Sequence, residues 1–282
     1  MVLGILAGSG SFPLLAAKNA KVKGVRVVSV GFEGITSKDM AALSDKHCWI
    51  GLGQLSRFLK FFRQEGVEGV MLAGTVDHAK ALQTKEAIQT LTDPRALKMI
   101  LSVRKKNAVS LLSAVIAEIE KDGMRVLPSF AYLEDHLLKP GPAGPIKPSK
   151  SQLEDIETGY RAAKTLSGLD IGLSCCVAAG AVVAVEAMEG TDQCIARAGE
   201  ILTKRSSNKG QLTVVKVARP QQDPRFDLPV IWPQTILTAS RAGAKCLAAE
   251  AGWTLVLDYE ETLKLALNHG IAVYGINADS LR

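Results

Sequence analysis

The first half of the chain alternates short apolar runs with segments whose apolar residues recur at helical spacing. A strand is expected where such a run is too short for a helix and ends at a turn residue. Strands are predicted at residues 2–7, 25–30, 48–52, 67–72 and 125–127, and helices at 13–19, 56–64 and within 84–120, with a break at Asp93 and Pro94. Alternation of this kind implies a parallel sheet covered by helices on both faces.

A proline-rich segment separates this half from the rest. Residues 139–149 hold four of the 11 prolines, so a stiff, extended linker is expected there. Beyond it an apolar hairpin is predicted across residues 171–188, turning at 178–180. Further helices are predicted at 152–166, 192–204 and 234–242, and strands at 212–217, 245–248, 254–257 and 271–274. The predicted fold class is α/β, with a Rossmann-like N-terminal domain (1–138), the linker (139–149) and a mixed α/β catalytic domain (150–282).

Composition narrows the class of partner. The chain has 282 residues, 22% of them charged, and a formal net charge of +6. This mild positive charge suits an acidic substrate or an anionic membrane surface. Nucleic acid is not expected as a partner, because no run of basic residues exceeds Arg104, Lys105 and Lys106. The five cysteines form no C-x-x-C pair, which favours free thiols in a cytosolic protein. The N-terminus lacks a basic region and predicts a strand, not a signal peptide.

The strongest candidate site is the segment PQQDPRFDLP at residues 220–229. Asp223 and Asp227 flank Arg225, and in an extended segment all three side chains would point to one side. Carboxylates suit Mg²⁺, with Mn²⁺ as a substitute, and a guanidinium can bind a phosphate with two hydrogen bonds. A salt-bridged surface loop is the simpler alternative.

A second acidic segment follows the apolar hairpin. Glu186 lies inside an otherwise apolar strand, where a carboxylate is costly unless it is paired. Glu189 and Asp192 follow it closely. As a purely structural alternative, Thr191 or Asp192 caps the next helix and the glutamates lie in a solvated turn.

Two loops that follow predicted strands are candidates for holding a phosphate. Gly8, Ser9, Gly10 and Ser11 come after the first strand and open a helix, where backbone N–H groups can bind an anion. This loop lacks the third glycine of a dinucleotide fingerprint, which argues against NAD and against an oxidoreductase. Asp77 and His78 follow another strand and should lie at the same edge of the sheet.

With these motifs in view, the chain resembles the LpxI family of UDP-2,3-diacylglucosamine pyrophosphatases of lipid A biosynthesis. The resemblance covers nearly the whole chain. The matching segments are GILAGSGSFP at 4–13, LLxAxxxxxExxGMxVLP at 111–128, DIxxG at 155–159, VAVEAMEGTD at 183–192, QDPRFDLP at 222–229 and AEAG at 249–252.

The resemblance implies two α/β domains with the substrate held between them, and Mg²⁺-dependent hydrolysis to UMP and 2,3-diacylglucosamine 1-phosphate. It implies that Asp227 is the essential aspartate. Arg225 and Asp223 lie in the same motif and are expected to be catalytic. The expected metal ligands are Asp227, Asp223, Glu189 and Asp192, and the expected substrate-binding residues are Gly8, Ser9, Gly10, Ser11, Thr191 and Gln222.

The family also implies a cytoplasmic protein that touches the inner membrane surface transiently, with a lipid-linked UDP-sugar as substrate and a homodimer as one possible assembly. The sequence departs from the family pattern at Leu173, Ala218, Gln221 and Trp232. These departures bear on substrate detail more than on the type of reaction. The competing class is a binding protein for a nucleotide-sugar or phospholipid that signals by domain closure.

Overall fold

The computed structural model describes residues 1–76, 93–103, 108–205, 212–226 and 228–281. The chain divides into two compact units. Unit 1 comprises Met1–Glu134 and Pro224–Asp227, and unit 2 comprises Asp135–Asp223 and Leu228–Arg282. A short stretch from late in the sequence therefore belongs with the N-terminal unit. None of the helices within the described ranges is both long and apolar enough to cross a membrane.

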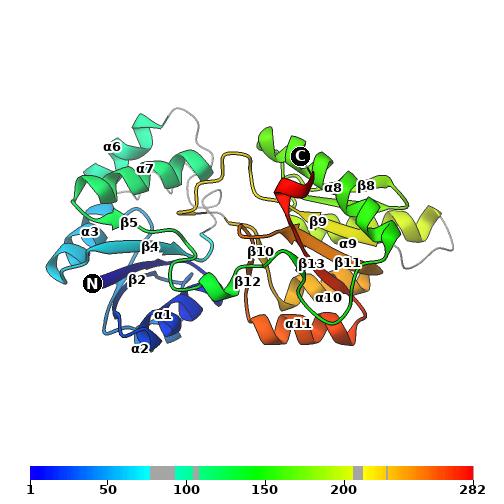
Figure 1. Ribbon diagram of the computed structural model, residues 1–282. Coiled ribbons are helices and arrows are strands. Elements are labelled where there is room, and N and C mark those ends of the chain that lie inside the picture. Colours follow the sequence, from blue (N-terminus) through cyan, green and yellow to red (C-terminus); the bar gives the residue numbers. More distant parts are fainter. Residues whose placement is uncertain (77–92, 104–107, 206–211, 227, 282) are drawn as a thin grey trace. The chain divides into compact units, whose positions relative to one another are not determined.

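Unit 1 is built on a five-stranded parallel sheet, as predicted, and its strand order is β3-β2-β1-β4-β5. Figure 1 shows α1 and α2 on one face of this sheet and α3, α6 and α7 on the other. Its strands are β1 (Val2–Ala7), β2 (Arg26–Phe32), β3 (Lys46–Ile50), β4 (Gly69–Ala73) and β5 (Arg125–Val126). Its helices are α1 (Phe12–Val22), α2 (Asp39–Leu43), α3 (Leu55–Gln64), α6 (Pro94–Ser102) and α7 (Ala108–Lys121).

Local sequence explains the helices that cover this sheet. The buried face of α3 repeats at helical spacing with Leu55, Phe58, Leu59 and Phe62. The predicted break before α6 is a helix start, because the Asp93 side chain accepts hydrogen bonds from the first-turn backbone N–H groups and the next residue is proline. Two parts of the predicted helical region, residues 84–92 and 104–107, lie outside the described residues.

Unit 2 contains a mixed six-stranded sheet in the order β6-β13-β11-β9-β7-β8. Strands β9, β11 and β13 are parallel, whereas β7 and β8 form the predicted antiparallel hairpin. The strands are β6 (Gly141–Pro142), β7 (Ser174–Ala178), β8 (Ala181–Val185), β9 (Leu212–Lys216), β11 (Ala244–Glu250) and β13 (Ala272–Ile276), and β10 (Val230–Ile231) pairs with β12 (Leu255–Val256). The predicted mixed α/β fold is confirmed.

Alternate sheet residues face two cores in unit 2. One face packs against α8 (Lys150–Gly168), and the other packs against α9 (Thr191–Arg205), α10 (Pro233–Arg241) and α11 (Tyr259–Asn268). The DIxxG motif serves the first of these faces. The buried Asp155 carboxylate accepts the Gly180 N–H at 2.6 Å in the β7–β8 turn, and a Cβ on Gly159 would lie 2.6 Å from Val215.

The proline-rich segment is not a free linker. Gly141–Pro142 forms β6 at the edge of the unit 2 sheet, and the Ala143 N–H donates to the Val273 carbonyl. Gly275 permits this close packing, since a Cβ there would lie 1.9 Å from the Lys139 carbonyl oxygen. Proline is tolerated because the strand is at an edge and needs few donors.

Candidate functional site

The glycine loop of unit 1 lies at the point where the strand order of the sheet reverses, between β1 and β4. In the order β3-β2-β1-β4-β5, the loops after β1 and β4 meet at the carboxyl ends of adjacent strands, the usual ligand position in such sheets. The Gly8 N–H donates to Ala73, and the Ser9 N–H and hydroxyl both donate to the Thr75 carbonyl at 2.8 Å. These donors hold the two loops together, so an anion at this edge would have to be bound by groups nearer Gly10 and Ser11.

The close contact of these loops explains their glycines. A Cβ on Gly8 would lie 2.7 Å from the Thr75 carbonyl oxygen, and a Cβ on Gly74 would lie 2.5 Å from that of Ser9. Asp77 and His78, the candidates that follow Thr75, lie outside the described residues.

Unit 2 gathers a polar cluster at the end of its sheet. Ser174 begins β7 and is paired in register with Lys216, which ends β9. The Lys216 ammonium donates to the Thr191 hydroxyl at 2.6 Å, and that hydroxyl lies 3.2 Å from both carboxylate oxygens of Glu186 and from the Ser174 hydroxyl. The Leu173 N–H also donates to Glu186 at 3.3 Å. The carboxylate in the apolar strand is therefore paired, as its burial requires.

Asp192 lies beside this cluster at the start of α9. One of its carboxylate oxygens, Oδ1, is buried without a hydrogen-bond partner in the described part of the chain. Burial raises the pKa of Asp192, the Glu186 carboxylate acts in the same direction, and the Lys216 charge and a hydrogen bond from Thr235 oppose them. Lys216 is only 9% exposed, so its charge acts on these acids in a poorly solvated environment.

Glu189 points to a different partner. Its carboxylate pairs with the Arg197 guanidinium and accepts the Ala187 N–H at 3.1 Å, while Arg197 also donates to the Val185 carbonyl. The Arg197 hydrogen bond lowers the pKa of Glu189. The described geometry thus uses Glu189 to fix the turn between β8 and α9.

The segment with Asp223, Arg225 and Asp227 is not one extended strand. A turn covers Pro224, Arg225 and Phe226, so the expectation of an extended segment is wrong; proline fits the bend because its φ is preset. The Gln222 side chain closes a local loop by accepting the Arg219 N–H and donating to the Asp223 carbonyl, both at 3.3 Å. Asp223 is half-buried, and Asp227 lies outside the described residues.

The turn itself is held within unit 1. The Ser129 N–H donates to the Pro224 carbonyl and the Ser129 hydroxyl donates to the Arg225 carbonyl, both at 2.7 Å. Arg225 pairs with Glu120 of α7 at 2.9 Å. The Phe226 side chain is 4% exposed and belongs to the unit 1 core.

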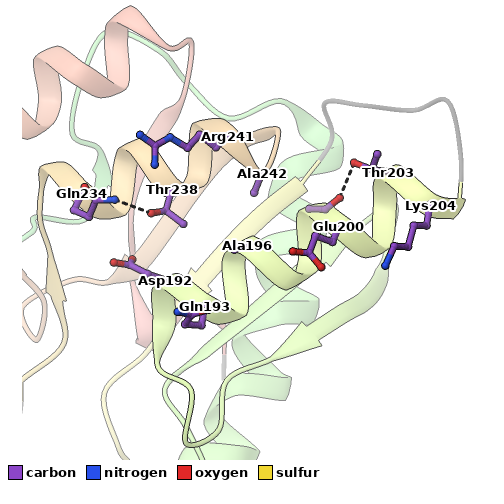
Figure 2. A pocket seen from close by; sticks show the side chains of 11 residues that line it. Asp192, Gln193, Ala196, Glu200, Thr203, Lys204, Gln234, Thr238, Arg241 and Ala242 are labelled. Atoms are coloured by element: carbon purple, nitrogen blue, oxygen red, sulfur yellow. Dashed lines mark hydrogen bonds between the residues drawn. The ribbon is translucent and has the colours of Figure 1, made fainter.

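A groove of about 630 Å³ lies between α9 and α10. In Figure 2, Asp192 lies at the α9 end nearest Gln234, and Lys204 lies toward the other end of that helix. The lining residues are Asp192, Gln193, Ala196, Gly199, Glu200, Thr203, Lys204, Gln234, Thr238, Arg241 and Ala242. Charged residues from both helices, Asp192, Glu200, Lys204 and Arg241, line it, and they do not suit an acyl chain, which requires apolar lining.

A divalent metal such as Mg²⁺ would need oxygen ligands gathered around one point. Within the described ranges, no three His, Cys, Asp or Glu side chains gather in a way that could hold a metal ion. Glu186 and Asp192 lie near one another, but Lys216 neutralises part of their charge and Glu189 is turned to Arg197. The described residues alone therefore do not form a magnesium site.

Sequence reasoning did not identify Lys216, Ser174 or Ser129 as site residues. Lys216 carried a usable signal, because it closes an apolar strand in which a charged residue needs a partner. Ser129 had none, because its partners lie 95 and 96 residues further along the chain.

Comparison with known proteins gives a consistent result for both units. The family description "LpxI N-terminal domain" matches residues 2–136 and "LpxI C-terminal domain" matches residues 139–274. A curated protein of Caulobacter vibrioides, "UDP-2,3-diacylglucosamine pyrophosphatase LpxI", is 29% identical over 280 residues, which cover 98% of this chain and 97% of that protein.

Solved structures give only weak likenesses. The biotin carboxylase domain of the Hydrogenobacter thermophilus 2-oxoglutarate carboxylase has a TM-score of 0.28 and 12% identity, covering 64% of this chain and 35% of that chain. The N5-carboxyaminoimidazole ribonucleotide synthetase of Thermotoga maritima has a TM-score of 0.26 and 9% identity, covering 66% and 41%. The chain thus spans well under half of either, and such scores carry no argument about function.

Proposed function

We propose, from the finding that this chain belongs to the LpxI family, that it hydrolyses the pyrophosphate bond of UDP-2,3-diacylglucosamine in lipid A biosynthesis. The products would be UMP and 2,3-diacylglucosamine 1-phosphate. The observation that carries the proposal is the match of both family domains, in order, across residues 2–274. The Caulobacter vibrioides relative, which is matched almost end to end, bears the name of this activity.

The residues supply the chemistry that such a hydrolysis needs. Water must attack a phosphorus atom surrounded by negative oxygens, so positive charge and hydrogen-bond donors must face the pyrophosphate. Arg225 is suited to bind a phosphate oxygen, since a guanidinium presents a planar set of donors. We assign to Asp227 the role of accepting the proton of the attacking water. Asp223 is its proposed neighbour in the same motif.

Two further groups are assigned to substrate binding. In unit 2, Thr191 is held by Lys216, and that ammonium brings positive charge to the end of the sheet. In unit 1, Gly10 and Ser11 lie at the carboxyl end of β1, where an anion is commonly bound. Gln222 is assigned to the loop that presents Asp223.

We propose a requirement for Mg²⁺, met also by Mn²⁺, with Asp227, Asp223 and Asp192 as the candidate ligands. Glu189, the fourth residue expected from the sequence, is paired with Arg197 and is assigned to the turn instead. Bound metal would neutralise phosphate charge and acidify a bound water. The test is exhaustive chelation followed by addition of each ion, with turnover measured throughout. Full activity after chelation would contradict this requirement and leave the cationic side chains as the charge stabilisers.

The reaction itself is tested with purified protein and the lipid-linked UDP-sugar. Equal amounts of UMP and 2,3-diacylglucosamine 1-phosphate should appear, identified by mass spectrometry. Hydrolysis in ¹⁸O-labelled water would show which phosphorus is attacked, because that product carries the label. Tight binding of the intact substrate without any turnover would favour the alternative, a binding protein that signals by a conformational change.

The location of the enzyme is proposed to be the cytoplasm, with transient contact at the inner membrane surface. The formal net charge of +6 favours an anionic surface. Co-sedimentation with vesicles containing anionic lipid should therefore weaken as salt is raised. Equal binding to neutral vesicles at all salt concentrations would contradict an electrostatic contact.

A further inference from the structure

Thr191 lies at the centre of the polar cluster at the end of the unit 2 sheet. Its hydroxyl oxygen accepts from the Lys216 ammonium at 2.6 Å and lies 3.2 Å from the Ser174 hydroxyl and from both carboxylate oxygens of Glu186. A threonine hydroxyl has one proton to donate and two lone pairs with which to accept. These contacts therefore decide the direction of each hydrogen bond that Thr191 makes.

The two charged neighbours fix these directions. An ionised carboxylate can only accept, so Thr191 donates its single proton to Glu186. An ammonium can only donate, so one lone pair of Thr191 accepts from Lys216, and the other accepts from Ser174. The Thr191 hydroxyl therefore has neither a proton nor a lone pair left for a substrate, and its role is to join Glu186 to Lys216.

Glu186 is itself held by the backbone of unit 2. Its carboxylate accepts the Leu173 N–H at 3.3 Å. Its main chain packs tightly against Gly172, where a Cβ would lie 2.1 Å from the Glu186 carbonyl oxygen. A lysine has a flexible four-carbon side chain, so a rigid support is needed to keep its ammonium in one place. The contacts from Glu186 through Thr191 to Lys216 provide that support.

The Lys216 ammonium lies where an anion is expected to bind. Lys216 is the last residue of β9, which runs parallel to β11 and β13, and ligands usually bind at the carboxyl ends of such strands. Thr191, which holds the ammonium, is the first residue of α9, and the N-terminus of a helix carries partial positive charge. Lys216 is 9% exposed, so water screens its charge poorly.

We propose that Lys216 binds a phosphate oxygen of the substrate, and that Glu186, acting through the Thr191 hydroxyl, is the positioning residue that holds the Lys216 ammonium in place. The inference rests on the proposed function, in which the reacting group is the pyrophosphate of a lipid-linked UDP-sugar. Thr191 thereby serves substrate binding through Lys216 and not through its own hydroxyl.

The test is a double-mutant cycle on hydrolysis of the lipid-linked UDP-sugar. Thr191→Val keeps the shape of the side chain and removes the hydroxyl, and it should lower kcat/KM by about 10-fold. In a Lys216→Met background the same change should cost less than about twofold, because the group that Thr191 positions is already gone. Thr191→Ser, which keeps the hydroxyl, should retain most of the rate. Equal losses from Thr191→Val in the two backgrounds would overturn the positioning role.

Substitutions of Glu186 separate positioning from net charge. Glu186→Met removes both the acceptor of the Thr191 proton and a negative charge near Lys216. If charge alone mattered, the ammonium would attract phosphate more strongly and kcat/KM would rise, whereas loss of positioning should lower kcat/KM by about 10-fold. Glu186→Gln keeps an oxygen that can accept the Thr191 proton and should retain most of the rate. A rise in Glu186→Met, or equal losses in both variants, would contradict the proposal.

Thr262→Val and Glu189→Gln are the matched controls. Thr262 is fully buried in unit 2, and its hydroxyl donates to the Leu257 carbonyl at 2.7 Å, so its substitution shows what the loss of a buried hydroxyl does to stability alone. Glu189 lies in the same motif as Glu186 but pairs with Arg197. Neither control should change kcat/KM by more than about twofold. A loss in Thr262→Val as large as that in Thr191→Val, at matched Tm, would make the effect of Thr191 one of stability.

Binding of inorganic pyrophosphate, measured by calorimetry, separates failure of this inference from failure of the proposed function. Lys216→Met and Thr191→Val should each weaken that binding by about 10-fold, and Thr191→Ser should not. If the parent protein shows this pattern but hydrolyses no lipid-linked UDP-sugar, only the proposed function fails. If the parent hydrolyses the substrate and Lys216→Met changes neither binding nor rate, only this inference fails. A parent protein that neither binds pyrophosphate nor hydrolyses the substrate would contradict both.

Discussion

The two acidic motifs look alike in the sequence but are held in different ways. The first, residues 183–192, lies wholly in unit 2. Its Glu186 and Thr191 are bound by neighbours from the same sheet, Ser174 and Lys216. The second, residues 222–229, is divided: Gln222 and Asp223 group with unit 2, while Pro224–Asp227 groups with unit 1.

The difference teaches what each motif can do on its own. The first motif is a self-contained polar network whose charges are already balanced by Lys216 and Arg197. The second is anchored in unit 1 by the Pro224 and Arg225 carbonyls, by the Arg225–Glu120 pair and by the buried Phe226 side chain. The proposed function places the chemistry in the second motif, and the first motif is proposed to serve binding and to support the turn.

The largest effect should come from Asp227→Asn, which keeps the shape of the side chain and removes its charge. Turnover should fall by about 10³- to 10⁴-fold, the usual loss when a catalytic acid or base is removed, while Tm stays close to that of the parent protein. Steady-state kinetics and thermal unfolding measure the two quantities. A protein that lost Tm but kept its rate per folded molecule would place Asp227 in a structural role instead.

Lys216→Met should have the next largest effect, because it removes the charge that balances the first motif. We expect kcat/KM to fall by about 10- to 100-fold, since a charge-assisted hydrogen bond contributes about 1.5–3 kcal/mol. Lys216→Arg should recover part of the rate. Lys245→Met is the control, because Lys245 is an exposed lysine on β11, the neighbouring strand. Equal losses in Lys216→Met and Lys245→Met would point to net charge alone.

Most of the fold could be predicted from the sequence because it follows from local periodicity. The apolar runs of β1, β2, β4 and β9 and the amphipathic face of α3 are present in the chain itself. Helix α11 was missed, although Glu260 and Glu261 in its first turn favour a helix start.

The errors concern contacts between distant residues. The segment of strand β6 was predicted to be a linker because it is rich in proline. It forms a strand because Gly275 lets it approach β13 closely. The turn at Pro224 is held by hydrogen bonds from Ser129 to the Pro224 and Arg225 carbonyls, and these partners are 95 and 96 positions apart in the chain. The acidic residues of the candidate site could be selected from motif chemistry, but the Glu189–Arg197 pair could not be foreseen without the fold.

Glu189→Gln should have the smallest effect on activity. It tests whether the first motif takes any part in the chemistry. Glu189 is held by Arg197, and both side chains are partly exposed, so activity should stay within about twofold of the parent protein. The pKa of Glu189 is lowered in the fold, chiefly by the Arg197 hydrogen bond. Its contribution to stability is therefore present above the ordinary pKa of a glutamate and is lost as pH falls through the lowered value.

The Gln variant should accordingly be slightly less stable than the parent at neutral pH, and the two should converge in acid; thermal unfolding across this range measures the difference. Arg197→Gln should reproduce the effect, and the double variant should add nothing, because both changes break one pair. A substitution at a metal ligand would instead change how activity depends on the Mg²⁺ concentration. If Glu189→Gln instead raised the Mg²⁺ concentration needed for half-maximal activity while Arg197→Gln did not, Glu189 would leave Arg197 to bind metal during turnover, and the first motif would share the chemistry with the second.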